Sequence, residues 1–92
     1  MTATQIFEKS NSTLIDNVSW SGINLDTKQV EFGLSLGEDF KQEKEENKIP
    51  SYKSIMISNH IVSLQENLSP LGLKIVYKEL RDKDLVFNVV EG

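Results

Sequence analysis

Apolar and polar residues alternate along several short stretches of this chain. The clearest alternation runs from Val30 to Leu36, with polar or small residues at every second position. A period of two with one polar face is typical of a half-buried antiparallel strand. Residues 18–25 alternate more weakly, and Gly22 shifts their phase, which predicts a bulge or bend at that glycine. Residues 26–29 lie between the two stretches and are expected to form a hairpin loop.

The clearest helical pattern covers the residues from Ser51 onwards. Four apolar residues form one stripe at helical spacing: Ile57, Ile61, Leu64 and Leu68. Ser51 is the expected N-cap of this helix. Pro70 and Gly72 are expected to end it, because proline cannot continue the hydrogen-bond ladder and glycine suits the exit turn.

A weaker helical pattern covers residues 4–18, with Thr4 as the expected N-cap. Polar residues at 10–13 interrupt it, and such side chains compete for the backbone hydrogen bonds of a helix. The end of the chain predicts a second hairpin, with strands at 73–80 and 85–90 and a charged loop at 81–84.

The expected order of elements is therefore αββαββ. Such an order predicts an α+β fold, a two-layer sandwich in which a four-stranded antiparallel sheet carries two helices on one face. The residues expected in the core are Trp20, Phe32, Leu34, Ile57, Ile61, Leu64, Leu68, Ile75, Tyr77 and Phe87.

Simple alternation also predicts apolar residues on the far face of the second hairpin. This expected patch consists of Val76, Leu80, Val86 and Val90. An apolar patch on the side away from the helices needs a cover, which indicates a protein interface.

Length and composition add limits to this interpretation. The chain has 92 residues, which predicts a single domain, and a net charge of -4, which argues against nucleic-acid binding and against an anionic membrane surface. Cysteine is absent, so disulfides and zinc–thiolate sites are excluded. No leader sequence or long apolar run is visible, and the expected location is cytoplasmic.

Residues 38–50 form a strongly charged segment, interpreted as a solvated linker, a flexible segment or a short exposed helix. Its carboxylates form a candidate surface for a basic protein partner: Glu38, Asp39, Glu43, Glu45 and Glu46.

No motif of the chain indicates a cofactor, a metal or a catalytic nucleophile. The five glycines form no phosphate-binding loop. His60 is the only histidine and is expected to be partly buried and structural, because it has no evident partner for acid–base chemistry. Basic residues of the second hairpin, with Lys74 and Lys78 expected on one face and Arg81 and Lys83 nearby, offer an alternative nucleic-acid-binding surface.

These observations favour a non-enzymatic protein-interaction module that forms a homodimer through the apolar patch. A variant of this hypothesis is an acidic regulator or inhibitor of a basic partner. Two alternatives remain open: a nucleic-acid-binding protein that uses the basic hairpin, and a small enzyme that uses carboxylates, a tyrosine (Tyr52 or Tyr77) and His60.

Overall fold

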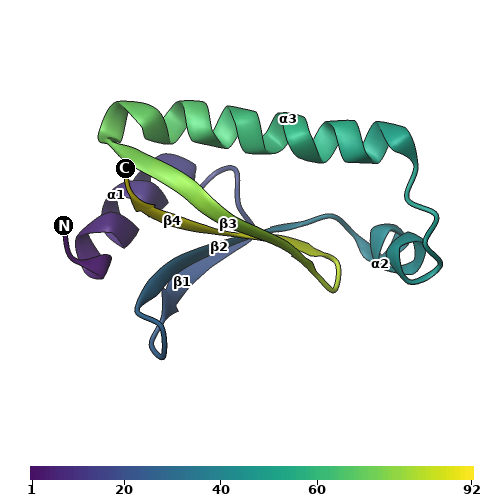
Figure 1. Cartoon of the computed structure of the whole chain (residues 1–92), viewed down its shortest axis with the longest axis horizontal. Helices are drawn as coiled ribbons and strands as arrows, with labels where there is room; N and C mark the ends of the chain where they lie inside the picture. The colour runs from purple at the N-terminus through teal and green to yellow at the C-terminus, as the bar shows by residue number, and fades with distance from the viewer.

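The computed structural model describes all 92 residues, which form a layer of helices on a layer of strands (Figure 1). The elements in chain order are α1 (Ala3–Leu14), β1 (Trp20–Asn24), β2 (Gln29–Ser35), α2 (Glu38–Glu45), α3 (Ser51–Leu68), the short 3-10 helix η1 (Ser69–Leu71), β3 (Leu73–Arg81) and β4 (Asp84–Glu91). The expected α+β sandwich is confirmed. The third helix, α2, lies between the two hairpins in the chain.

The sheet is antiparallel throughout and has the strand order β1-β2-β4-β3. The second strand of each hairpin therefore lies in the centre, where Phe32 of β2 faces Phe87 of β4 and their rings stack at 5.6 Å. The pairing of β1 with β2 continues through Gly22 without a register shift, so of the two features expected there, a bulge or a bend, the bulge is wrong. The central pair, β2 with β4, joins the two hairpins into one sheet, and each hairpin supplies two of its four strands.

The main core lies between the sheet and the two helices α1 and α3. Eight buried residues form it: Leu14, Val30, Phe32, Leu64, Leu68, Leu73, Phe87 and Val89. Five of the eight elements contribute one or two residues each to this core, which is small, as is usual for a domain of this size.

The first helix begins two residues earlier than the sequence pattern predicts. Thr2, not Thr4, is the N-cap, and it forms a capping box in which Gln5 accepts a hydrogen bond from the backbone N–H of Thr2. Ser10 is fully buried, and its hydroxyl donates to the carbonyl oxygen of Ile6. Ser10, the first of the polar residues that were expected to interrupt the helix, is accommodated in this way, because serine can satisfy its hydroxyl on the preceding turn.

The long helix α3 begins at Ser51 with Pro50 as its N-cap, so the expected N-cap at Ser51 is wrong by one residue. It ends where predicted, because η1 follows with Pro70 as its second residue, and Gly72 comes next with a left-handed φ of 72°. Only the C-terminal half of α3 is anchored firmly. Leu64 and Leu68 are its buried residues.

Gln65 joins the same half of α3 to the edge of the sheet. Its side-chain nitrogen donates to the carbonyl oxygen of Leu73 at 3.1 Å, and its oxygen accepts from the N–H of Ile75 at 2.8 Å. These bonds satisfy backbone groups that an edge strand would otherwise leave unpaired. The first part of β3 is therefore covered by α3.

A β-bulge at Val76 changes which residues of β3 face the helices. The register with β4 shifts by one residue between Ile75 and Tyr77, so Val76 has no partner of its own. Side chains beyond a bulge point to the face opposite to the one that simple alternation predicts. Lys78 and Leu80 therefore lie on the side of α3, opposite Phe87 and Leu85, and Tyr77 lies on the far face.

The predicted core is confirmed in its centre and wrong at its margins. Phe32, Leu64, Leu68 and Phe87 are buried as expected. Four further residues are only half-buried: Leu34, Ile57, Ile61 and Ile75. Trp20 and Tyr77 are exposed, the first because it starts the edge strand β1 and the second because of the bulge.

Candidate functional site

The apolar patch expected on the far face of the sheet does not form as one surface. Val86 is fully buried, Val90 is half-buried and Val76 is exposed at the bulge. Leu80 is exposed as well, but it lies opposite Leu85 on the side of the sheet that faces α3. The expected grouping of these four residues is therefore wrong, and the physical reason is the bulge.

Trp20 explains why Val86 is buried. A Cβ atom placed on Gly33 would lie 2.0 Å from Cε2 of Trp20, so the indole lies directly across this glycine. The indole Nε1 donates a hydrogen bond of 3.1 Å to Oδ2 of Asp84, which shows that the ring reaches β4. Val86 is paired with Gly33 in the same row of the sheet, and the indole covers this row.

The rest of the far face is polar, and the charges around Tyr77 are paired. The hydroxyl of Tyr77 donates to Glu79 at 3.2 Å, and this carboxylate raises the pKa of Tyr77 above its ordinary value. Arg81 forms an ion pair with Glu79 and lies 3.6 Å from Glu31. These residues satisfy one another, whereas Lys74, on the same face before the bulge, takes part in no ion pair.

The basic residues of the second hairpin do not share a face. Lys74 precedes the bulge and Lys78 follows it, so their side chains lie on opposite sides of the sheet. Lys83 pairs with Glu38 at 2.7 Å, and Arg81 pairs with carboxylates of the far face. The expected basic surface is therefore wrong as a grouping, although nucleic-acid binding itself stays an untested alternative.

The charged segment after β2 forms the short helix α2, one of the three forms that the sequence pattern allowed. Phe40 is its only buried residue and is 1% exposed. Polar contacts hold the helix at its sides. Lys44 donates from Nζ to the carbonyl oxygen of Leu80 at 3.1 Å.

Two of the five carboxylates in the expected acidic surface are used within the chain. Glu43 pairs with Lys53 of α3, and both side chains are largely covered. Glu38 pairs with Lys83, and the hydrogen bond from this lysine lowers the pKa of Glu38. The remaining carboxylates are exposed: Asp39, Glu45 and Glu46. Binding of a basic partner by this surface stays a prediction.

His60 is exposed on α3, so the expectation of a partly buried histidine is wrong. It lines neither of the two hollows on the surface.

No three side chains of the metal-binding kinds come together in the chain. None of its helices has both the length and the apolar character needed to cross a bilayer.

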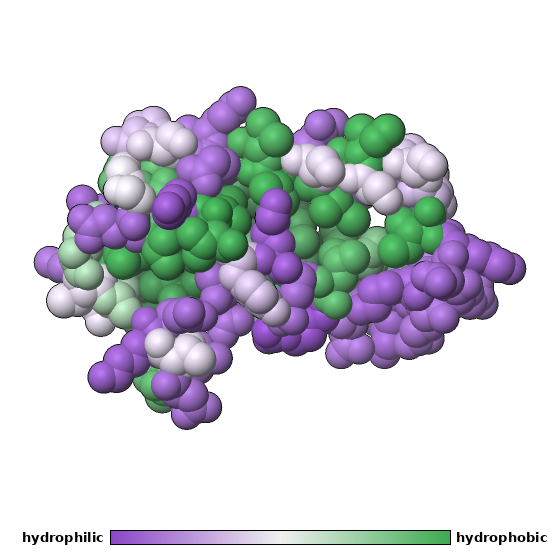
Figure 2. Space-filling model, in the orientation of Figure 1, coloured by the Kyte–Doolittle hydropathy of each residue, from purple (hydrophilic) through white to green (hydrophobic).

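The most unusual surface of the molecule is the outer face of α3, defined here as the exposed side that carries Tyr52, Ile55, Met56, Asn59 and Val62. The four large apolar side chains of this face are between 41% and 66% exposed. Figure 2 shows apolar residues along this helix, in contrast to the hydrophilic region of α2. A helix that is apolar on both sides is normally covered on both sides.

The absence of charged residues in this part of the sequence indicates this surface, whereas the spacing of the apolar residues does not. From Ser54 to Gln65 the helix contains no charged residue if His60 is neutral. A solvated helix usually carries charges on its outer side. Lys53 and Glu66 flank this uncharged run, and Lys53 is turned towards Glu43.

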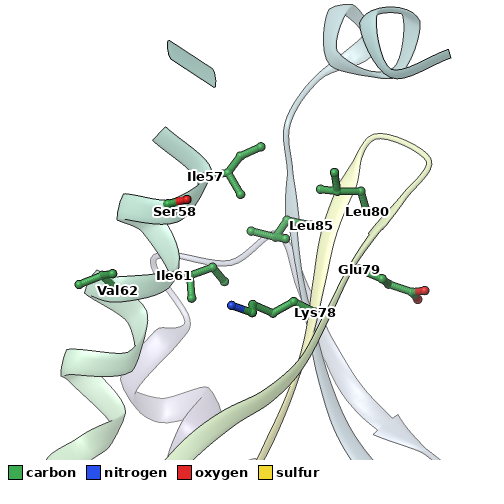
Figure 3. Close-up of a pocket in the computed structure, with 8 residues that line it drawn as sticks. All are labelled: Ile57, Ser58, Ile61, Val62, Lys78, Glu79, Leu80 and Leu85. Carbon is green, nitrogen blue, oxygen red and sulfur yellow. The ribbon is translucent and has the colours of Figure 1, made fainter. Parts of the chain in front are cut away.

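A second feature lies beneath the same helix. The N-terminal half of α3 stands away from the sheet and leaves an open groove of about 510 Å³ above β3 and β4. Eight residues line the groove: Ile57, Ser58, Ile61, Val62, Lys78, Glu79, Leu80 and Leu85. Figure 3 shows the aliphatic side chains of α3 and of the second hairpin on its two sides, with Lys78 extending between them.

Comparisons of the chain with models of protein families, with curated proteins and with solved structures found no match.

Proposed function

We propose that this chain is a protein-interaction module that associates with a second copy of itself through the outer face of α3. The observation that carries the proposal is the exposure of four large apolar side chains on a helix face without a charged residue. Surface apolar residues scattered singly are ordinary, but a contiguous group marks an interaction site. Covering the group contributes about 25 cal/mol for each Å² of apolar surface removed from water.

The outer face of α3 supports a second copy as the partner because it is self-complementary. In a two-fold arrangement with antiparallel helices, each residue contacts the residue at the mirrored position of the other copy. With the axis at Asn59, Met56 lies opposite Val62 of the second copy, and Ile55 lies opposite Ser63. Asn59 then lies opposite itself, where two amides can exchange hydrogen bonds and set the register.

Charge also favours this face over every other part of the surface. Two copies, each with a net charge of -4, repel each other, and the repulsion is smallest where the contact contains no carboxylate. The outer face of α3 carries no carboxylate between Ser54 and Gln65. A standard interface covers about 800 Å² on each partner, which is about 14% of the 5718 Å² surface of this chain. The uncharged run of α3 from Ser54 to Gln65, about 18 Å long at 1.5 Å for each residue, lies at the centre of such a contact.

The test is the mass of the protein in solution, measured by sedimentation velocity over a range of concentrations. The wild-type chain should form a dimer, and Ile55→Glu should leave a folded monomer, because each new carboxylate would be buried opposite Ser63 of the second copy without a cation to pair with. Leu25→Glu is the matched control. Leu25 is 86% exposed in the turn between β1 and β2, so this charge should leave the dimer unchanged.

Two results would overturn the proposal. One is a wild-type chain that stays monomeric at every concentration, and the other is a dimer that survives Ile55→Glu. Circular dichroism of each variant shows whether the fold is retained. Substitution of Val86 does not test self-association, because this residue is fully buried and a charge there would unfold the chain.

A further inference from the structure

The groove beneath α3 combines an aliphatic lining with a single free cation. Its apolar wall consists of Ile57, Ile61, Val62, Leu80 and Leu85, all of them branched aliphatic side chains. The groove is separate from the outer face of α3, since it lies on the side of the helix that faces the sheet (Figure 3). Of its lining residues, only Val62 belongs to both surfaces.

Lys78 supplies the cation. The bulge at Val76 places it on the side of α3, and Figure 3 shows its side chain directed between the helix and the hairpin. None of the ion pairs in the molecule involves Lys78. The adjacent Glu79 points away from the groove and is paired with Arg81 on the far face. An ammonium group at an aliphatic groove is therefore available to an anion.

We infer that this groove binds an aliphatic carboxylate, with the hydrocarbon chain along the isoleucine and leucine side chains and the carboxylate at Nζ of Lys78. An ammonium group is a compact point charge with three donors, and it forms short, strong hydrogen bonds to a carboxylate. Ligand sites typically have volumes of about 300–1,000 Å³, are mostly apolar and hold a few polar groups that orient the ligand. The groove has these properties.

The groove is open to solvent, and its volume of about 510 Å³ lies within the usual range of ligand sites. A carboxylate with a hydrocarbon chain of about twelve carbons is a suitable probe of it. Each methylene that leaves water strengthens binding, so shorter acids should bind progressively more weakly.

A peptide fits the groove less well. One turn of an α-helix, about 10 Å across and 5.4 Å long, fills about 420 Å³, so the groove takes little more than a single turn. The other polar side chain directed at it is the hydroxyl of Ser58. A hydrocarbon chain needs no hydrogen-bond partners, whereas the amides of an extended peptide lose free energy when they are buried without them.

The experiment is isothermal titration calorimetry of the full chain with sodium dodecanoate below its micellar concentration. We expect one site per chain and a negative heat-capacity change, the sign of apolar burial. Lys78→Met should weaken binding about tenfold, because it keeps the aliphatic stem and removes one charge-assisted contact. Ser58→Phe should abolish binding by filling the groove. Lys74→Met is the matched control and should leave binding unchanged, because Lys74 lies on the other face of the sheet.

Dodecyltrimethylammonium, which has the same chain and the opposite charge, should bind more weakly than dodecanoate. Equal affinity for the two compounds, an unchanged affinity of Lys78→Met, or no measurable heat would each overturn the inference. Loss of dodecanoate binding as the protein concentration rises would also overturn it, because a second copy would then occupy the groove. The monomeric variant Ile55→Glu should bind dodecanoate as the wild type does, so this inference and the self-association are tested independently.

Discussion

The contact between Trp20 and Gly33 predicts that Gly33→Ala destabilises the fold, although alanine suits a strand better than glycine does. The new Cβ atom would lie 2.0 Å from the indole, well inside the closest approach of real atoms. The backbone of Gly33 is held in the centre of the sheet by its pairs with Trp20 and Val86. The indole is 37% exposed and must therefore swing away into the solvent.

The size of the effect follows from what the displaced indole leaves behind. The hydrogen bond to Asp84 contributes about 1 kcal/mol at an exposed position. Renewed exposure of Val86 costs about 1 kcal/mol, part of the roughly 1.5–3 kcal/mol for burying a valine. The lost contact of the indole costs about 1 kcal/mol more for about 40 Å² of apolar surface. Replacing glycine in a strand regains about 0.5–1 kcal/mol, so the expected net loss is about 2 kcal/mol.

Urea unfolding of the wild type and of Gly33→Ala measures this difference. Trp20 is the only tryptophan, so its fluorescence reports the displacement directly and should shift to longer wavelength. For a domain of this size, about 2 kcal/mol lowers the melting temperature by about 8–16 °C. The reasoning also predicts coupling: in a Trp20→Ala background, Gly33→Ala should be neutral or stabilising, because nothing remains for the Cβ atom to displace. An equal loss in both backgrounds would refute it.

Two further predictions concern α2. Phe40→Ala should lower the free energy of unfolding by about 3 kcal/mol, because truncating a buried phenylalanine leaves a cavity. The control Leu25→Ala should change this free energy by less than about 0.5 kcal/mol. Thermal melts of the two variants measure the difference. Since Lys83 lowers the pKa of Glu38, their ion pair stabilises the fold above the ordinary carboxyl pKa of 4.5 and is lost on acidification. The melting temperatures of the wild type and Lys83→Met should differ at neutral pH and converge as the pH falls through the lowered pKa of Glu38.

The sequence predicts the architecture well wherever the pattern is local. The alternation after Val30 and the helical stripe that ends at Leu68 both correspond to observed elements, and Pro70 ends α3 as expected. These features depend on residues close together in the chain. The alternation and the helical spacing therefore contain the information needed.

The candidate site was harder to predict because it depends on a bulge and on neighbours distant in the chain. The stretch from Lys74 to Leu80 contains neither glycine nor proline, so nothing in its alternation marks Val76 as the unpaired residue. The position of Trp20 across Gly33 follows from pairing between strands, which the pattern within one strand does not show. As a result, the far-face patch was wrong and the groove at Lys78 was missed.

The unequal attachment of α3 implies unequal protection of its backbone. Leu64, Gln65 and Leu68 hold the second half of the helix to the core and to β3, while the first half spans an open groove. Local openings of a protein involve the segments with the fewest buried contacts. Amide hydrogens in the first half should therefore exchange with solvent deuterons through partial fraying that leaves the second half intact. Any ligand or second copy that holds the first half in place would slow this exchange there, and the slowing would map the contact residue by residue.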